Sequence, residues 1–189
     1  MSQKFTSART SVNAHNLPKV FGKLPADLPR HSLVYDLGAG KYTDHIESFI
    51  RSRGLVYLPY DPYNKPDDVN ATSTTFLLNA MHLRYPVTVT CSNVLNVIDD
   101  DAEIKKIAAG IVHIVLRTGG QAYITVYVGD RSGIGRQTGP DQYQRNQPLA
   151  YYLPLFEGTA TLNHYGKRYT TTAAIERGMI VVRCVEVSK

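Results

Sequence analysis

The chain has 189 residues, of which 43% are hydrophobic and 20% charged, an ordinary composition for a globular domain. A chain of this length can bury a core that needs neither a disulfide nor a metal. It contains two cysteines, Cys91 and Cys184, and no CxxC motif or His/Cys cluster, so we expect no disulfide scaffold and no structural zinc site. No apolar run is long enough to span a membrane, and the first ten residues lack an apolar signal core. These features predict a reducing, cytoplasmic setting.

The net charge of +5 is unevenly distributed. Residues 1–30 carry five basic side chains against one acid, Asp27, and contain three prolines. We therefore expect a loose basic lead-in at 1–30, followed by a single domain at 31–189. A basic arm can steer a protein toward phosphates, although a solvated leader is the simpler interpretation.

Strand and helix patterns alternate after residue 31. Strands are predicted at 32–35, 55–60, 87–91, 122–128, 159–164 and 179–187, and helices at 43–53, 99–118 and 149–156. Residues 67–86 are ambiguous, with a helix expected over 74–83 and a vestigial strand at 69–71. The alternation predicts an α/β fold with a mainly parallel sheet and helices on both faces. Ligands of such sheets bind at the carboxyl ends of the strands.

The first predicted strand leads into the sequence Asp36-Leu-Gly-Ala-Gly40. Two glycines permit a tight turn and allow a ligand to approach the backbone closely. A dinucleotide fingerprint would require a small residue at position 43, which is Thr43 after the bulky Tyr42. A mononucleotide phosphate loop would require Gly at position 35 and Ser or Thr at 42, and both positions are Tyr.

A second acid, Asp61, ends the next strand, 21 residues after Gly40. The combination of the Asp36 glycine turn with Asp61 resembles class I S-adenosylmethionine-dependent methyltransferases. Longer segments resemble the short methyltransferases found beside DNA phosphorothioation genes and in phage genomes. These segments are Ala8–Thr10, Tyr60-Asp-Pro-Tyr-Asn-Lys-Pro66, Thr90-Cys-Ser-Asn-Val-Leu-Asn-Val-Ile98 and Gly135–Arg145. A phage-encoded protein of this kind would work in the host cytoplasm.

The resemblance implies a Rossmann-like class I methyltransferase sandwich, mainly parallel with an antiparallel last strand. It implies S-adenosylmethionine as cofactor, no metal, and methyl transfer to an unidentified acceptor, for which nucleic acid is a candidate. In that family the glycine turn lies under the methionine part of the cofactor and the second acid binds the ribose hydroxyls. The expected cofactor-binding residues are Asp36, Gly38, Ala39, Gly40, Asp61, Pro62, Tyr63, Ser92, Asn93 and Val94.

No catalytic residue can be assigned from the sequence. Amino-methylating DNA enzymes of the best-known type place Asp/Asn-Pro-Pro-Tyr where this chain has Cys91-Ser-Asn-Val94, so that route is not expected. Cys91 on an apolar strand is expected to be a packing residue and not a nucleophile. His82, Asp130 and His164 are weak candidates for a general base. Methyl transfer from a sulfonium is an in-line displacement for which alignment alone supplies much of the rate.

Residues 129–147 form a long polar segment, predicted to be a loop. Arginine, amide and tyrosine side chains commonly contact phosphates and bases, so Arg136, Gln137, Tyr143 and Arg145 are candidates for binding DNA or RNA. A solvated surface loop is the alternative. Two other functions also stay open: a non-catalytic protein that binds the cofactor or nucleic acid with this fold, and an enzyme that degrades the cofactor without an acceptor.

Overall fold

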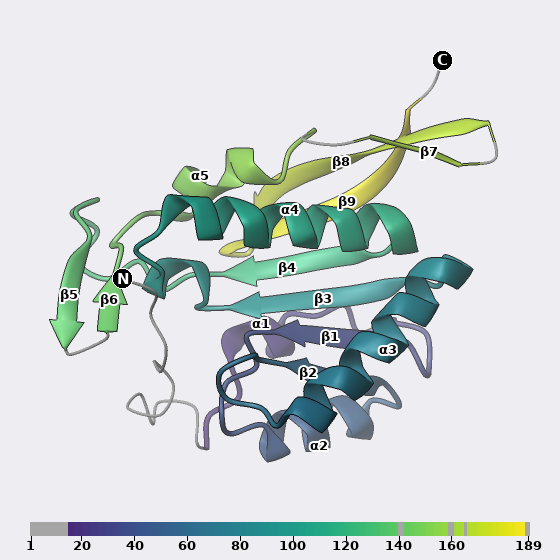
Figure 1. Cartoon of the computed structure of the whole chain (residues 1–189), viewed down its shortest axis with the longest axis horizontal. Helices are drawn as coiled ribbons and strands as arrows, with labels where there is room; N and C mark the ends of the chain where they lie inside the picture. The colour runs from purple at the N-terminus through teal and green to yellow at the C-terminus, as the bar shows by residue number, and fades with distance from the viewer. Residues whose placement is uncertain (1–14, 140–141, 159–160, 165, 188–189) are drawn as a thin grey trace.

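The computed structural model describes residues 15–139, 142–158, 161–164 and 166–187 (Figure 1). Its centre is a seven-stranded sheet with the strand order β2-β1-β3-β4-β9-β8-β7. In that order the strands are Val56–Tyr60, Leu33–Leu37, Val87–Ser92, Gln121–Thr125, Met179–Val187, Lys167–Glu176 and Thr161–His164.

Four adjacent strands, β2, β1, β3 and β4, run parallel, and β9 then pairs antiparallel with β4. Strands β8 and β7 extend the sheet by two further antiparallel pairings. The predicted α/β class and antiparallel last strand are therefore confirmed. Half of the sheet's pairings are nevertheless antiparallel, because the segment after residue 164, which received no prediction, forms the long strand β8.

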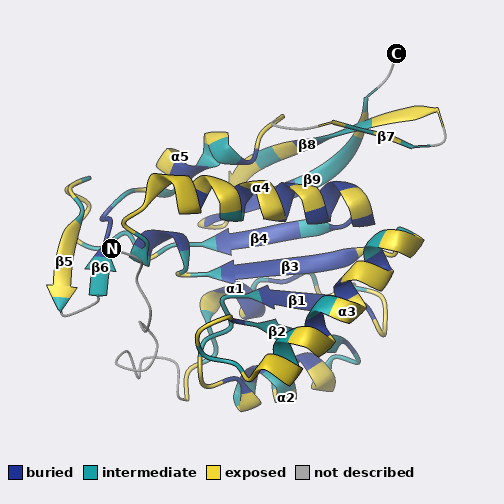
Figure 2. Ribbon diagram, in the orientation of Figure 1, coloured by how far each residue is buried: buried dark blue, intermediate teal, exposed yellow. Residues whose placement is uncertain are grey.

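Helices cover both faces of the sheet. The α-helices are α1 (Lys19–Gly22), α2 (Asp44–Ser52), α3 (Asp67–Leu83), α4 (Asp101–Thr118) and α5 (Leu149–Tyr152). Side chains of α3, α4 and α5 belong to one hydrophobic cluster, whereas those of α1 and α2 belong to a second cluster on the opposite face. Figure 2 shows the consequence: the central strands are buried and the outer faces of α3 and α4 are exposed.

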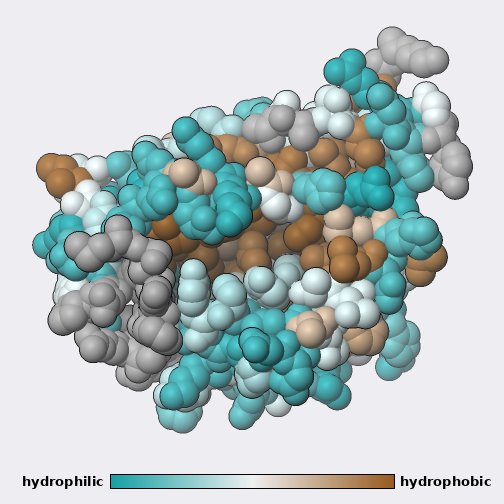
Figure 3. Space-filling view, in the orientation of Figure 1, coloured by the Kyte–Doolittle hydropathy of each residue, from teal (hydrophilic) through white to brown (hydrophobic). Residues whose placement is uncertain are grey.

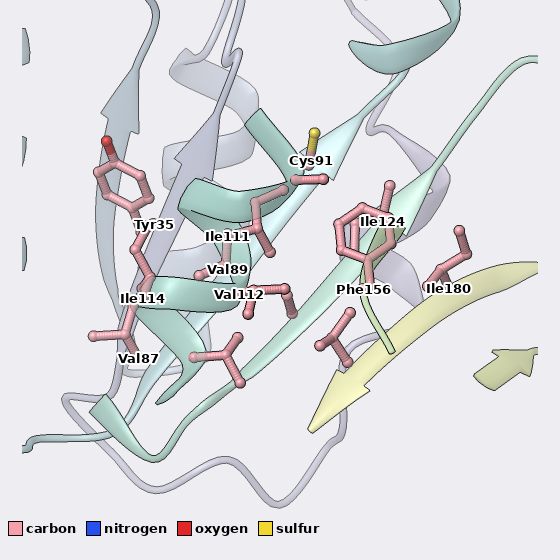
Figure 4. Packing of buried hydrophobic residues seen from close by; sticks show 14 of the residues in the cluster. Tyr35, Val87, Val89, Cys91, Ile111, Val112, Ile114, Ile124, Phe156 and Ile180 are labelled. Carbon is pink, nitrogen blue, oxygen red and sulfur yellow. The ribbon is translucent and has the colours of Figure 1, made fainter. Parts of the chain in front are cut away.

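Alternation along the strands assigns side chains to the two clusters. Val34 packs against α1 and α2, and its neighbour Tyr35 packs on the α3–α4 face. Ile180 and Val181 divide in the same way on β9. On the α4 face, Ile111, Val112 and Ile114 pack against the strand residues Val87, Val89, Cys91, Ile124 and Ile180 (Figure 4). This period of two is the one expected of strands that are buried on both faces.

Helix α4 follows the sequence closely. Its apolar stripe packs on the sheet: Ile107 is half-buried, and the other four members are buried, namely Ile104, Ala108, Ile111 and Val115. The acidic start supplies the N-cap, since the Asp100 carboxylate accepts from the Ala102 amide at 2.8 Å. Gly119 ends the helix in the left-handed conformation at φ 69°.

Three predictions differ from the structure. Residues 67–83 form one helix, α3, so the vestigial strand at 69–71 is wrong; Pro66 at the N-cap and the acids of the first turn start this helix earlier than its β-branched composition indicated. The strand predicted to reach residue 128 ends at Thr125. The predicted 129–147 loop contains a hairpin of β5 (Arg136–Gly139) and β6 (Gln142–Gln144).

The described part of the basic lead-in, from residue 15 onward, is packed and not loose. Val20 and Phe21 of α1 are 0% and 1% exposed, and Leu24 is also buried. Phe21 meets the Tyr57 ring edge-on with the ring centroids 6.4 Å apart. Residues 8–10, part of the stated resemblance, and the basic residues Lys4 and Arg9 lie outside the described residues.

Candidate functional site at the carboxyl edge of the sheet

The glycine turn after β1 is fixed to the end of β2. The Gly38 and Ala39 amides both donate to the Tyr60 carbonyl, at 2.8 and 3.1 Å. Gly38 and Gly40 have φ angles of 77° and 71°, a left-handed conformation that glycine adopts without strain. The sequence therefore forms the predicted tight turn.

Val94 occupies the space that Gly38 leaves. A Cβ at Gly38 would lie 2.3 Å from Val94 Cγ2, so the absent side chain lets the loop after β3 pack on the turn. The space at Gly38, which the sequence indicated for a ligand, is therefore filled by Val94. Of the other predicted residues in this loop, Ser92 bonds to Thr125 through their hydroxyls at 3.1 Å, and Asn93 is exposed.

Asp61 joins the two loops at this edge. Its carboxylate accepts from the Gly40 amide at 2.9 Å, from the Tyr63 and Asn64 amides at 2.9 and 3.1 Å, and from the Asn64 side-chain amide at 3.1 Å. A carboxylate has about four lone-pair sites, so protein donors fill this one. A ligand diol would have to displace one or two of these donors.

Asp36 lies beneath the turn and faces the interior. It is 3% exposed, and its two oxygens accept from Tyr57 Oη at 2.6 Å and Thr90 Oγ1 at 2.7 Å. Burial raises the pKa of Asp36 to about 6, although both hydrogen bonds act in the opposite direction. Burial raises the pKa of Tyr57, and the neighbouring Asp36 carboxyl raises it further. Asp36 therefore links β1 to its neighbours β2 and β3 through buried hydrogen bonds, just before the turn.

Lys65 connects the same two loops and was missed by the sequence analysis. Its ammonium donates to Thr43 Oγ1 at 2.6 Å and to the Lys41 carbonyl at 3.2 Å. Partial burial lowers the pKa of Lys65, against nearby carboxylates that raise it, Asp44 first among them. No motif distinguishes this lysine from other surface lysines, because its role depends on a contact across 22 residues.

The predicted aromatic border of the site is open to solvent. Tyr63 is 55% exposed, Pro62 is exposed beside it, and Tyr42 on the glycine loop is 40% exposed. Rings at the ends of β1 and β2 are thus available to cover a ligand at this edge.

The four candidate nucleic-acid residues differ in how far they are exposed. Arg136 and Gln137 are exposed on β5, and Arg136 lies 3.8 Å from the Asp130 carboxylate. Tyr143 is half-buried, with its hydroxyl placed so closely over Gly135 that a Cβ there would lie 1.8 Å away. Arg145 is buried: its Nε donates to the Ile98 carbonyl at 2.5 Å and its Nη1 pairs with Asp101 at 2.7 Å. Arg145 is therefore an internal tether and is not accessible to a phosphate.

A buried amide network, also missed by the sequence analysis, anchors the β5–β6 hairpin. Asn96 Nδ2 donates to Gln144 Oε1 at 3.1 Å, and Gln144 Nε2 donates to the Tyr127 carbonyl at 2.8 Å. The Arg145 amide donates to the Asn96 carbonyl at 2.8 Å. These bonds hold the hairpin beyond the ends of β3 and β4, where Figure 1 shows it.

No general base stands at the glycine turn among the candidates named from sequence. His82 is exposed on α3, Asp130 lies at the hairpin, and His164 is on the distant strand β7. Cys91 is fully buried, and burial raises the pKa of its thiol, as expected of a packing residue. Within the described ranges, no three His, Cys, Asp or Glu side chains are grouped as metal ligands.

Among the described helices, none is both long and apolar enough to cross a bilayer. Comparison with protein-family models and with curated proteins finds no match for this chain. Function therefore has to be inferred from the geometry of this edge and from the motif resemblance.

Proposed function

We propose that the protein binds S-adenosylmethionine at the carboxyl edge of β1 and β2 and transfers its methyl group to an acceptor. The observation that carries this proposal is the joining of the two predicted acidic motifs: the Asp61 carboxylate lies 2.9 Å from the Gly40 amide of the glycine turn. Residues 21 apart in sequence thus form one polar edge.

The strand order supports a ligand at this position. The chain passes from β1 to β2 on one side and then from β2 back to β3 on the other side of β1, so the strand order reverses at β1. Open α/β sheets bind ligands at such a reversal, outside the carboxyl ends of the strands. The placement of an antiparallel β9 between β4 and β8 also agrees with the Rossmann-like methyltransferase sandwich that the motif resemblance implies.

The chemistry of the edge suits a cationic nucleoside. Asp61 can accept a hydrogen bond from a ribose hydroxyl once the Asn64 side chain swings away, because this side chain is the one donor of the four that does not belong to the backbone. A second ribose hydroxyl would also have to displace one of the backbone amides. Tyr63 and Pro62 follow directly and would border the adenine or ribose. Val94 would lie beside the methyl group. The main contribution of the protein to the rate would then be the alignment of the methyl group with the acceptor.

Nucleic acid is the proposed class of acceptor. The hairpin that carries Arg136, Gln137 and Tyr143 is anchored beside the loop of Ser92, Asn93 and Val94, on the same edge of the sheet. Exposed arginine and amide groups next to the transfer site fit a phosphate-bearing acceptor.

The test is transfer of a radiolabelled methyl group from S-adenosylmethionine to DNA and RNA, each supplied single- and double-stranded. Label is expected in one of these polymers, with less transfer by an Arg136→Ala variant. Lys106→Ala, which removes an exposed cation on α4, is the control. Absence of label from every polymer, with the cofactor bound, would contradict the proposed acceptor.

A second candidate, a non-catalytic cofactor-binding protein, is favoured by the saturated Asp61 carboxylate and by the positions of His82, Asp130 and His164 away from the turn. Thermal melting with and without S-adenosylmethionine and its demethylated product separates the possibilities, because a bound ligand raises the melting temperature. A shift without turnover supports the non-catalytic protein. Consumption of the cofactor without an acceptor would indicate a cofactor-degrading enzyme.

A further inference from the structure

A groove of about 560 Å³ lies on the outer side of α4, away from the glycine turn. One wall is α4 itself, and the other is formed by η3 (Leu153–Leu155) and the start of β7. Its exposed floor is apolar, with Ala109 of α4 beside Leu155 and Leu162, above the buried side chains of Val112 and Leu116. Figure 3 shows hydrophobic surface on both sides of the polar outer face of α4. One of these two hydrophobic areas lies between α4 and the strands β8 and β7.

The rim of the groove is basic. Lys105, His113 and Arg117 are exposed along α4, and no acid is among the described residues that line the groove. Neither Lys105 nor Arg117 forms an ion pair with the described residues, whereas the neighbouring Lys106, outside the groove, pairs with Glu103 at 3.5 Å. The two cations are thus left unneutralised beside an apolar floor.

The spacing of the two cations along α4 fits a helix as the occupant of the groove. Lys105 and Arg117 are twelve residues apart, or about 18 Å along the helix axis, which is just over three helical turns. A helix in such a groove inserts apolar side chains at helical spacing and places its polar side chains at the rim. The concave shape and the small number of cations suit a helix better than a flat membrane surface.

We propose that this groove binds an acidic amphipathic helix of a partner protein. The apolar face of that helix would lie on Ala109, Leu155 and Leu162, and carboxylates near its ends would pair with Lys105 and Arg117. The proposal does not depend on the cofactor site.

The test uses a fluorescein-labelled helical peptide of about 15 residues, with Leu at core spacing and Glu elsewhere, and the same peptide with Lys in place of Glu. Fluorescence anisotropy with the full chain should show saturable binding of the Glu peptide only. Lys105→Glu/Arg117→Glu should weaken it at least about tenfold. Ala109→Trp, which fills the exposed floor without changing the charge, should weaken it as well.

The matched control is Lys106→Glu/Arg168→Glu, which changes the net charge equally. Arg168 is exposed and paired in register with Asn163, so it lies on the sheet face opposite Leu162. Circular dichroism melts establish that each variant is folded. Equal binding of both peptides, or equal loss in the control, would overturn the proposal. Two other outcomes would also overturn the proposal if the Glu peptide fails to bind. One is a dimer that the groove variants abolish, and the other is binding to phosphatidylglycerol vesicles that the same variants abolish.

Discussion

Asp61 carries more of the candidate site than any other residue, because four protein donors converge on its carboxylate. Asp61→Ala should weaken binding of S-adenosylmethionine about ten- to a hundredfold, the effect of losing a charged hydrogen-bonding partner. Calorimetry on the folded variant measures this loss. Asp68→Ala is the control, since Asp68 is exposed at the start of α3 and accepts only from the Val69 amide. Unchanged affinity in Asp61→Ala would remove Asp61 from the site.

Asp36 gives a pH-dependent prediction. Its pKa of about 6 in the folded protein lies above the ordinary 3.8, so between these values the folded state holds a proton that the unfolded chain has released. The contribution of Asp36 to the free energy of unfolding is therefore largest below pH about 4 and falls as the pH rises through about 6, by at most about 3 kcal/mol.

Asp36→Asn removes the ionisable group and should abolish this fall. Its stability relative to the wild type should rise steadily across that pH range in denaturant titrations. A stability difference between the two proteins that is independent of pH would show that Asp36 keeps an ordinary pKa.

At the scale of elements, the β5–β6 hairpin depends on buried polar contacts and not on a hydrophobic core. Arg145→Ala deletes the bonds to Ile98 and Asp101 and should cost about 1–3 kcal/mol of unfolding free energy. Hydrogen exchange in the hairpin should accelerate, while α4 keeps its protection. Arg136→Ala on the exposed face of the same hairpin is the control and should change stability by less than about 0.5 kcal/mol. Equal effects of the two variants would refute the tether.

Elements with strong local signals were predictable from sequence. Helix α4 has an apolar stripe, an acidic N-cap and a terminal glycine, β3 is rich in β-branched residues, and β9 begins with four apolar residues. Helix α3 was predicted too short because Val69 and Thr72, in its first part, favour strands locally. Packing of Ser73, Leu77 and Ala80 on the sheet stabilises the helix despite that preference.

The long-range contacts of the site could not be predicted from the sequence. The motif spacing correctly brought Asp61 beside Gly40, because the ends of adjacent parallel strands meet at one edge. No local pattern could show that Val94 fills the space at Gly38, that Lys65 reaches Thr43, or that Arg145 turns inward.

At the scale of the whole molecule, the sheet places two separate surfaces on one domain. The carboxyl edge of β1 and β2 holds the candidate cofactor site, with the hairpin beside it, and the outer side of α4 holds the basic groove. If both are occupied as proposed, a partner on α4 would leave the glycine turn accessible. Cofactor affinity should therefore be the same with and without the acidic peptide.

The most direct test of the central claim is a calorimetric titration of the wild-type chain with S-adenosylmethionine and with its demethylated product. The geometry predicts saturable heat at one site per chain for both compounds, and none for ATP, whose phosphates would face acidic side chains. Absence of heat with both compounds at about millimolar concentration, which corresponds to binding weaker than about −4 kcal/mol, would contradict it.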